Sequence, residues 1–275
     1  MKESIQFIIK NRRSIFYALL TGLGQLFSIH LLKEKGINAF LISNAVTCLI
    51  LCFEIYLNWR YATKVLRQID MPDINVYNLW GHLLNHITLP ILLFISFSGF
   101  IYFNKDDLVR LVALSLLIFI NSILFINIRS YYEDKFRIET STRYIYDIIK
   151  LFIFFFGVNL ILHIQIILQL EVWVASISIA LLVLLLGFLL IYRQSQVNIH
   201  TIYYIIISAF IIGVLFMLIS FSPILTLGIN IVIFLLFYFD ISILQHKLDR
   251  SLTLEIFTEY LLTLILAFVI FAGIS

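Results

Sequence analysis

Four acidic side chains stand at or inside long apolar stretches of this chain: Glu54, Asp240, Glu255 and Glu259. A carboxylate in hydrocarbon costs about 2.5–3.5 kcal/mol on insertion scales, and such groups usually face the bundle interior or a water-filled cavity. Glu54, Asp240 and Glu259 are therefore candidate substrate-binding residues. Glu255 and Glu259 are four residues apart and would share one face of a helix.

Glu259 is the strongest of these candidates, because only the apolar sequence YLLTLILAFVIFAGIS follows it and a short carboxylate cannot reach as far as a lysine can. We predict that Glu259 faces inward, where it pairs with a base or a polar residue or carries a proton. In the alternative interpretation, the acids pair with Lys247, Arg250 and Lys150 at the level of the lipid headgroups.

Amide side chains are spread thinly through the middle of the apolar runs, and they allow two interpretations. They bond across helices and hold the bundle together, or some of them line a polar path. A path would run past Asn44, Pro90 and Asn121, because a proline inside a helix kinks it and kinks often border cavities. Asn121 is therefore the fourth candidate substrate-binding residue. The amides in question are Gln25, Asn44, Asn121, Asn159 and Asn230.

The composition is that of a membrane protein, with 62% hydrophobic and 13% charged residues and a mean hydropathy of +1.04. About 20 helical residues cross a bilayer, and nine apolar runs reach that length. Backbone groups in hydrocarbon must bond to one another, so these runs predict an all-α polytopic bundle in one domain, residues 1–275. The predicted spans are 14–32, 37–57, 83–103, 108–128, 148–168, 172–192, 202–221, 224–244 and 254–274.

Lysine and arginine are divided unevenly between the two sides of these spans, with 15 on the side of the N-terminus and 4 on the other. Cytoplasmic connections carry the excess of basic residues, so we expect the N-terminus in the cytoplasm and, after nine spans, the C-terminus outside. The abundance of Ile, Phe, Asn and Lys is typical of AT-rich bacterial genomes, which suggests the bacterial cytoplasmic membrane.

Several function classes lack their sequence signatures. The chain has no phosphate-binding GxxxxGK[ST], no GxSxG and no HExxH, so a single-chain ATP-driven pump and a recognisable enzyme are not expected. His82 and His86 have helical i, i+4 spacing but no third metal ligand, and the Lys105-Asp106-Asp107 loop is too short for a glycosyltransferase site. We expect no metal, no cofactor and no nucleic-acid partner. The lipid bilayer is the expected partner, with an amphiphilic or lipid-linked substrate as a further one.

Two loose resemblances accompany these patterns. Asn127-Ile128, Arg137, Arg143 and the closing stretch LDRSLTLEIFTEYLL resemble an uncharacterised family of multi-span membrane proteins from candidate-phylum bacteria, a domain of unknown function. That resemblance implies a membrane protein with no assigned activity. The stretch LLKEKGINAFLISNAVTCLILCFE, which ends at Glu54, resembles the first helix hairpin of polysaccharide flippases, which usually have twelve or more spans.

Two kinds of function remain open from the sequence. One is a non-enzymatic envelope component or transporter-like protein, which binds partners within the membrane. The other is a flippase or exporter of a lipid-linked oligosaccharide or another amphiphile. A transporter should have polar spans that converge on a cavity, whereas a scaffold should have its amides paired between tightly packed helices.

Overall fold

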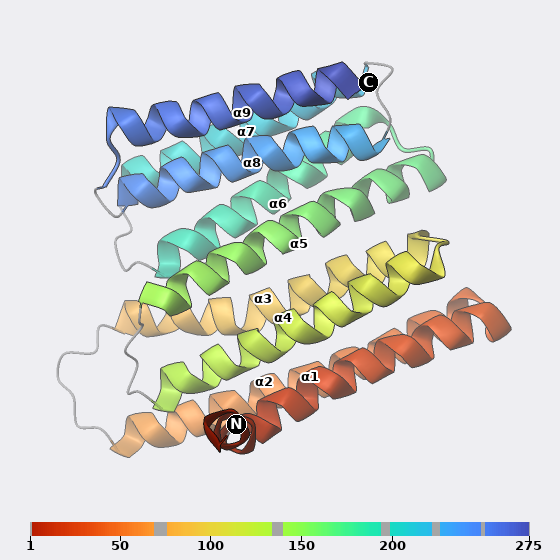
Figure 1. Cartoon of the computed structure of the whole chain (residues 1–275), viewed down its shortest axis with the longest axis vertical. Helices are drawn as coiled ribbons and strands as arrows, with labels where there is room; N and C mark the ends of the chain where they lie inside the picture. The colour runs from red at the N-terminus through yellow and green to blue at the C-terminus, as the bar shows by residue number, and fades with distance from the viewer. Residues whose placement is uncertain are drawn as a thin grey trace. The chain divides into compact units, whose positions relative to one another are not determined.

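The computed structural model describes residues 2–68, 76–133, 140–193, 199–221, 226–248 and 251–274, and in these ranges it has nine α-helices and no strand (Figure 1). The predicted all-α fold is confirmed. The helices are α1 (Lys2–Lys35), α2 (Ile37–Gln68), α3 (Val76–Phe103), α4 (Asp107–Glu133), α5 (Thr140–Ile167), α6 (Val172–Arg193), α7 (Ile199–Ser220), α8 (Thr226–Leu248) and α9 (Leu254–Ile274).

Eight of the helices in the described part of the chain, α1 to α8, are long and apolar enough to cross a membrane. Each of the first eight predicted spans overlaps one of them, so the chain is a multi-pass membrane protein. The ninth predicted span coincides with α9, some of whose side chains lie outside the described residues; a ninth crossing stays a prediction. The qualifying segments are 11–35, 37–58, 85–103, 107–130, 144–167, 172–191, 199–220 and 228–248.

Contacts divide the chain into two compact units, residues 1–153 and residues 154–275, which we call unit 1 and unit 2. Helix α5 runs through the division, so its first half belongs to unit 1 and its second half to unit 2. The predicted single membrane domain stays a prediction.

Unit 1 is built around α1, which packs against α2, α3 and α4 (Figure 1). Two glycines allow the close approach: a Cβ on Gly22 would collide with the side chain of Ile118 on α4, and one on Gly24 would lie 2.7 Å from Cγ2 of Thr47 on α2. Small residues let helices pack closely in lipid, where dispersion forces replace the hydrophobic effect as the cause of association.

The two ends of unit 1 differ in their connections. We call the end where α1 begins, α2 ends, α3 begins and α4 ends the N-terminal end of the unit. At the opposite end, the turn end, Gly36 joins α1 to α2 with a φ of 80°, a left-handed conformation that favours glycine. The loop at residues 104–106 joins α3 to α4 at the same end, as the contact between Lys33 and Asp107 shows.

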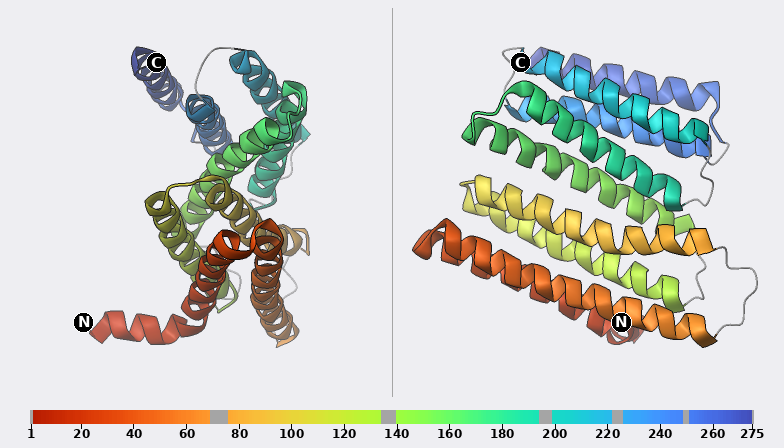
Figure 2. Two further views of the ribbon diagram at one scale, coloured as in Figure 1. Left: turned by 90° about the vertical axis from the view of Figure 1, so that its right-hand side faces the viewer. Right: turned by 180° about the vertical axis from the view of Figure 1, so that it is seen from behind.

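Unit 2 has α6 against α7, and α8 between α7 and α9 (Figure 2). The α6–α7 contact again depends on glycine, since a Cβ on Gly187 would lie 2.8 Å from Cγ2 of Ile205, and Gly213 faces Ser176. Helix α9 packs on α8 and leaves most of its described side chains exposed. The interior of unit 2 therefore lies among α5 to α8 and not under α9.

Candidate functional site

Glu54 is buried near the N-terminal end of unit 1 and is bonded to neighbours on two helices. Its side chain is 1% exposed, and its Oε2 accepts hydrogen bonds from Nη2 and Nε of Arg13 at 2.9 and 3.2 Å. Asn58 Nδ2, one turn further along α2, donates to Oε1 at 3.2 Å. Arg129 on α4 is close enough for its charge to act on the same carboxylate. The partner of Glu54 is thus Arg13, and not one of the bases expected from the sequence.

Further charged and polar groups are buried at this end of the unit, where α5 begins. Tyr146 OH lies 3.1 Å from Nε2 of His86 on α3. Lys150 is fully buried, and its Nζ donates to Oδ1 of Asp147 at 3.3 Å. Buried ions require such partners, because desolvation costs several kcal/mol per ion. His82, the neighbour of His86 in the sequence pattern, has its side chain outside the described residues.

The middle of unit 1 is closed by a side-chain hydrogen-bond cluster. Gln25 on α1 is fully buried, and its Nε2 donates to Asn44 Oδ1 at 2.6 Å and to Ser98 Oγ at 2.5 Å. One turn nearer the turn end, Ser28 Oγ donates to Ser43 Oγ at 2.8 Å. Three helices are therefore joined by polar groups at mid-span, which is the pairing expected of amides that hold a bundle together.

Asn121 differs from these amides because it is fully buried and neither its Nδ2 nor its Oδ1 has a hydrogen-bond partner among the described residues. Asn230 on α8 of unit 2 has the same property. A buried polar group without a partner costs about 1–3 kcal/mol. Asn121 and Asn230 are therefore the mid-span positions where a small polar group would gain most from binding. The role of Asn121 in substrate binding stays a prediction.

A groove runs along the seam between α1 and α2, on the half of unit 1 nearest the turn end. It encloses about 420 Å³ and is open along its side. Its lining combines small residues with large apolar ones, so a hollow remains between the larger side chains. The lining residues are Gly24, Phe27, Leu31, Lys35, Ala39, Ile42, Ser43, Val46, Thr47 and Ile50. Nine of these ten carry no charge, and the exception is Lys35 at the turn end.

The polar atoms in the wall of this groove are already used within the protein. Thr47 Oγ1 donates to Ser43 O at 2.9 Å, and Ser43 Oγ accepts from Ser28. A ligand at this depth would therefore meet mostly apolar groups and polar atoms that are already hydrogen-bonded within the protein. A second hollow of about 440 Å³ lies between α2 and α3 and is lined by Cys52, Ile55, Tyr56, Ile87 and Ile91.

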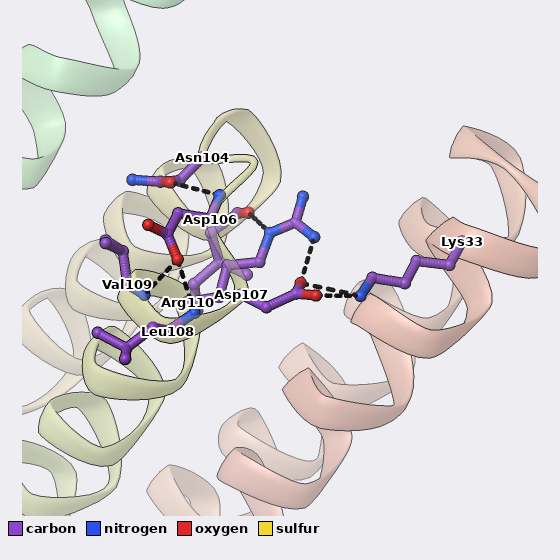
Figure 3. A network of polar contacts seen from close by, with 8 residues as sticks. Lys33, Asn104, Asp106, Asp107, Leu108, Val109 and Arg110 are labelled. Atoms are coloured by element: carbon purple, nitrogen blue, oxygen red, sulfur yellow. Dashed lines mark hydrogen bonds and ion pairs between the residues drawn. The ribbon is translucent and has the colours of Figure 1, made fainter.

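The charged residues around the α3–α4 loop form a compact network (Figure 3). Lys33 Nζ lies 2.8 Å from both carboxylate oxygens of Asp107, and Arg110 Nη1 lies 3.3 Å from Oδ1. Asp106 begins α4 as an N-cap, with its Oδ1 accepting from the backbone NH of Leu108 at 2.8 Å. The acidic pair considered above in connection with a glycosyltransferase site therefore caps a helix and ties α4 to α1.

In unit 2, Asp240 is held by hydroxyl groups of the neighbouring helix. Its Oδ1 accepts a hydrogen bond from Tyr204 OH at 2.9 Å and a short one from Ser208 Oγ, both on α7. Lys247, the base expected beside it, lies instead over the Tyr204 ring, with Nζ 5.1 Å from the centroid. The carboxylate thus joins α7 to α8 through hydroxyls.

The predicted inward orientation of Glu259 is wrong, because its side chain is exposed. Helix α9 packs on α8 with a narrow stripe that includes Tyr260, whose ring meets those of Tyr238 and His246. Glu255 is exposed as well. The acids at positions 255 and 259 share one face as predicted, but it is the face turned away from α8.

The four predicted site residues are divided between the two units, and their role in substrate binding stays a prediction. Glu54 and Asn121 belong to unit 1, and Asp240 and Glu259 to unit 2. The residues that sequence reasoning missed are Arg13, Ser98, Tyr204 and Ser208. Arg13 was counted only as a basic flank, and the hydroxyl residues give no signal in a hydropathy profile. The positions of these residues along their helices do not show that they face inward. That becomes clear only when the helices that pack against them are known.

In the part of the chain that the structure describes, no three His, Cys, Asp or Glu side chains come together as a metal site would require. No family model matches the chain, and neither the search of curated proteins nor the search of solved structures gave a significant match.

Proposed function

We propose that the protein is a non-enzymatic component of the bacterial cytoplasmic membrane that acts by binding a ligand within the membrane, without carrying a polar substrate through its core. The observation behind this proposal is the closed middle of unit 1. There the amide of Gln25 donates to both Asn44 and Ser98, while Gly24 and Thr47 bring α1 and α2 into contact.

The position of the α1–α2 groove also favours binding over transport. Its lining residues reach from position 24 to position 35 on α1 and from 39 to 50 on α2, which is about 16 Å at about 1.5 Å per residue. The hydrocarbon core is about 30 Å thick, so the groove has the depth of one leaflet. A flippase needs a path for the headgroup across both leaflets, whereas the lining of this groove ends at Gly24 on α1 and at Ile50 on α2.

Lipid scrambling by purified protein tests this proposal. Proteoliposomes containing a trace of headgroup-labelled fluorescent phospholipid are treated with dithionite, which bleaches the outer leaflet. We expect the inner-leaflet fluorescence to stay protected as it is in protein-free vesicles, with and without an imposed pH gradient. Bleaching of the inner leaflet in either condition would contradict the proposal and support the flippase alternative.

A further inference from the structure

Lys35 stands at the turn end of the α1–α2 groove and differs from its neighbours in having no partner among the residues that the structure describes. The other charged groups of the last turns of α1 are paired: Lys33 with Asp107 at 2.8 Å, and Glu34 with His30 at 3.2 Å. Lys35 is exposed and lines the groove, and none of the described side chains forms an ion pair or hydrogen bond with it. Within the described part of the chain, it is therefore an unpaired cation at the mouth of an apolar groove.

The groove matches a hydrocarbon chain in length and in chemistry. Its depth of about 16 Å, from the helical rise, is close to the hydrocarbon thickness of one leaflet, about 15 Å. Large apolar residues such as Phe27, Leu31 and Ile42 form its walls, and the hydroxyls of Ser43 and Thr47 are bonded within the protein. A lipid chain needs no hydrogen bonds in such a groove, and a polar ligand would find few groups there to bond with.

From this juxtaposition we infer that the α1–α2 groove binds an anionic phospholipid of the surrounding bilayer, with one acyl chain between α1 and α2 and the phosphate at Lys35. The zwitterionic phosphatidylcholine presents a compensating cation and gains less from Lys35. This inference names a ligand class for the proposed function. The inference rests on that proposed function and fails if the groove does not select anionic lipid. The proposed function fails if lipids cross the membrane through the protein.

The charge of Lys35 sets the expected size of the effect. A basic residue near an anionic membrane surface contributes about 1 kcal/mol, which corresponds to a preference of about fivefold. Lys33 belongs to the same last turn of α1, so it shares the position of Lys35 relative to the helix dipole. Because its charge is paired with Asp107, Lys33 is the matched control.

The test uses full-length protein in phosphatidylcholine nanodiscs that contain phosphatidylglycerol with a photoactivatable acyl chain. We expect crosslinks in the segments 24–35 and 39–50, displaced about fivefold better by unlabelled phosphatidylglycerol than by added phosphatidylcholine. Lys35→Gln should remove this preference and Lys33→Gln should keep it. Ala39→Phe, which fills the groove, should reduce crosslinking, and Ala45→Phe on the exposed face of α2 should not.

Three results would overturn the inference. They are equal displacement by the two lipids, equal effects of Lys35→Gln and Lys33→Gln, and lipid adducts that lie outside the segments 24–35 and 39–50. Both lysines are exposed, and Lys33→Gln removes an exposed ion pair with Asp107 that contributes little to stability. If the protein scrambled lipids, the proposed function would fail, but the crosslinking results would not change. The two failures are therefore distinguishable.

Discussion

Replacing Glu54 with leucine is expected to lower the free energy of unfolding by about 2–3 kcal/mol. The substitution leaves Arg13 and Asn58 without the acceptor they share. Breaking a buried pair by removing one partner costs about 3–5 kcal/mol, and the expected loss is smaller because the Arg13 side chain is 38% exposed and regains some hydration. The measurement is an unfolding titration with dodecyl sulfate from a mild detergent, followed by helical circular dichroism.

The control for this prediction is Glu34→Leu. Glu34 is paired with His30 four residues earlier, but its side chain is 55% exposed, and exposed pairs contribute about 0–1 kcal/mol. Glu54→Gln should lose less stability than Glu54→Leu, because the amide oxygen still accepts from Arg13. The double variant Arg13→Gln, Glu54→Gln should lose less than the sum of the single ones. Equal stability of Glu54→Leu and Glu34→Leu would show that the buried pair does not hold α1 to α2.

Replacing Gly24 with leucine is expected to cost about 3 kcal/mol of stability, at the upper end of the range for overpacking a tight contact. A Cβ at this position already lies 2.7 Å from Cγ2 of Thr47, so α1 and α2 must separate. The separation would also pull Gln25 away from Asn44, which lies 2.6 Å from it. The same titration measures the loss.

Leu23→Val is the matched control. Leu23 is the residue before Gly24 in α1, but it lies on the exposed face of the helix, with 60% of its side chain accessible. Its expected effect is within about 0.5 kcal/mol, as for most exposed substitutions. If Gly24→Leu were no more destabilising than Leu23→Val, α1 and α2 would not be in close contact at Gly24 and Thr47.

The helical architecture can be predicted from the sequence, because the hydrocarbon of the bilayer requires it. Long apolar runs in hydrocarbon must satisfy their own backbone groups, so each predicted run overlaps an observed helix, and the bounds of 254–274 and α9 are the same. The helices extend further than the predicted spans, as α1 does from Lys2 to Lys35. Hydropathy marks the segment that fits the membrane and carries no signal for a helix that continues into polar sequence.

The orientation of single side chains was less predictable. Glu259 was expected inside because burial of an unpaired acid is costly, but that argument assumes that other helices surround α9. Helix α9 packs only on α8 among the described elements, so its acids stay exposed. Glu54 was correctly recognised as unusual, whereas its partner Arg13 lies 41 residues away in the sequence and is found only when α1 and α2 are seen side by side.

The amides illustrate the same limit. Their positions in mid-span are visible in the sequence, and pairing across helices was one of two interpretations. The structure pairs Gln25 with Asn44 and gives Asn121 no partner among the described residues, because helix rotation decides which amides meet. Periodicity alone does not settle rotation in helices that are apolar on nearly every side.

The most direct test of the closed middle of unit 1 is thiol labelling of single cysteines placed within it. Asn44→Cys, Ser98→Cys and Asn121→Cys are made in a Cys48→Ser, Cys52→Ser background, with Lys105→Cys in the exposed loop as the reactive control. A membrane-impermeant maleimide is added to protein in open membranes. We predict that the three core cysteines stay unlabelled while Lys105→Cys reacts completely, and that all four react after denaturation. Labelling of the core cysteines in intact membranes at the rate of the loop cysteine would contradict the account and show a water-filled path through the unit.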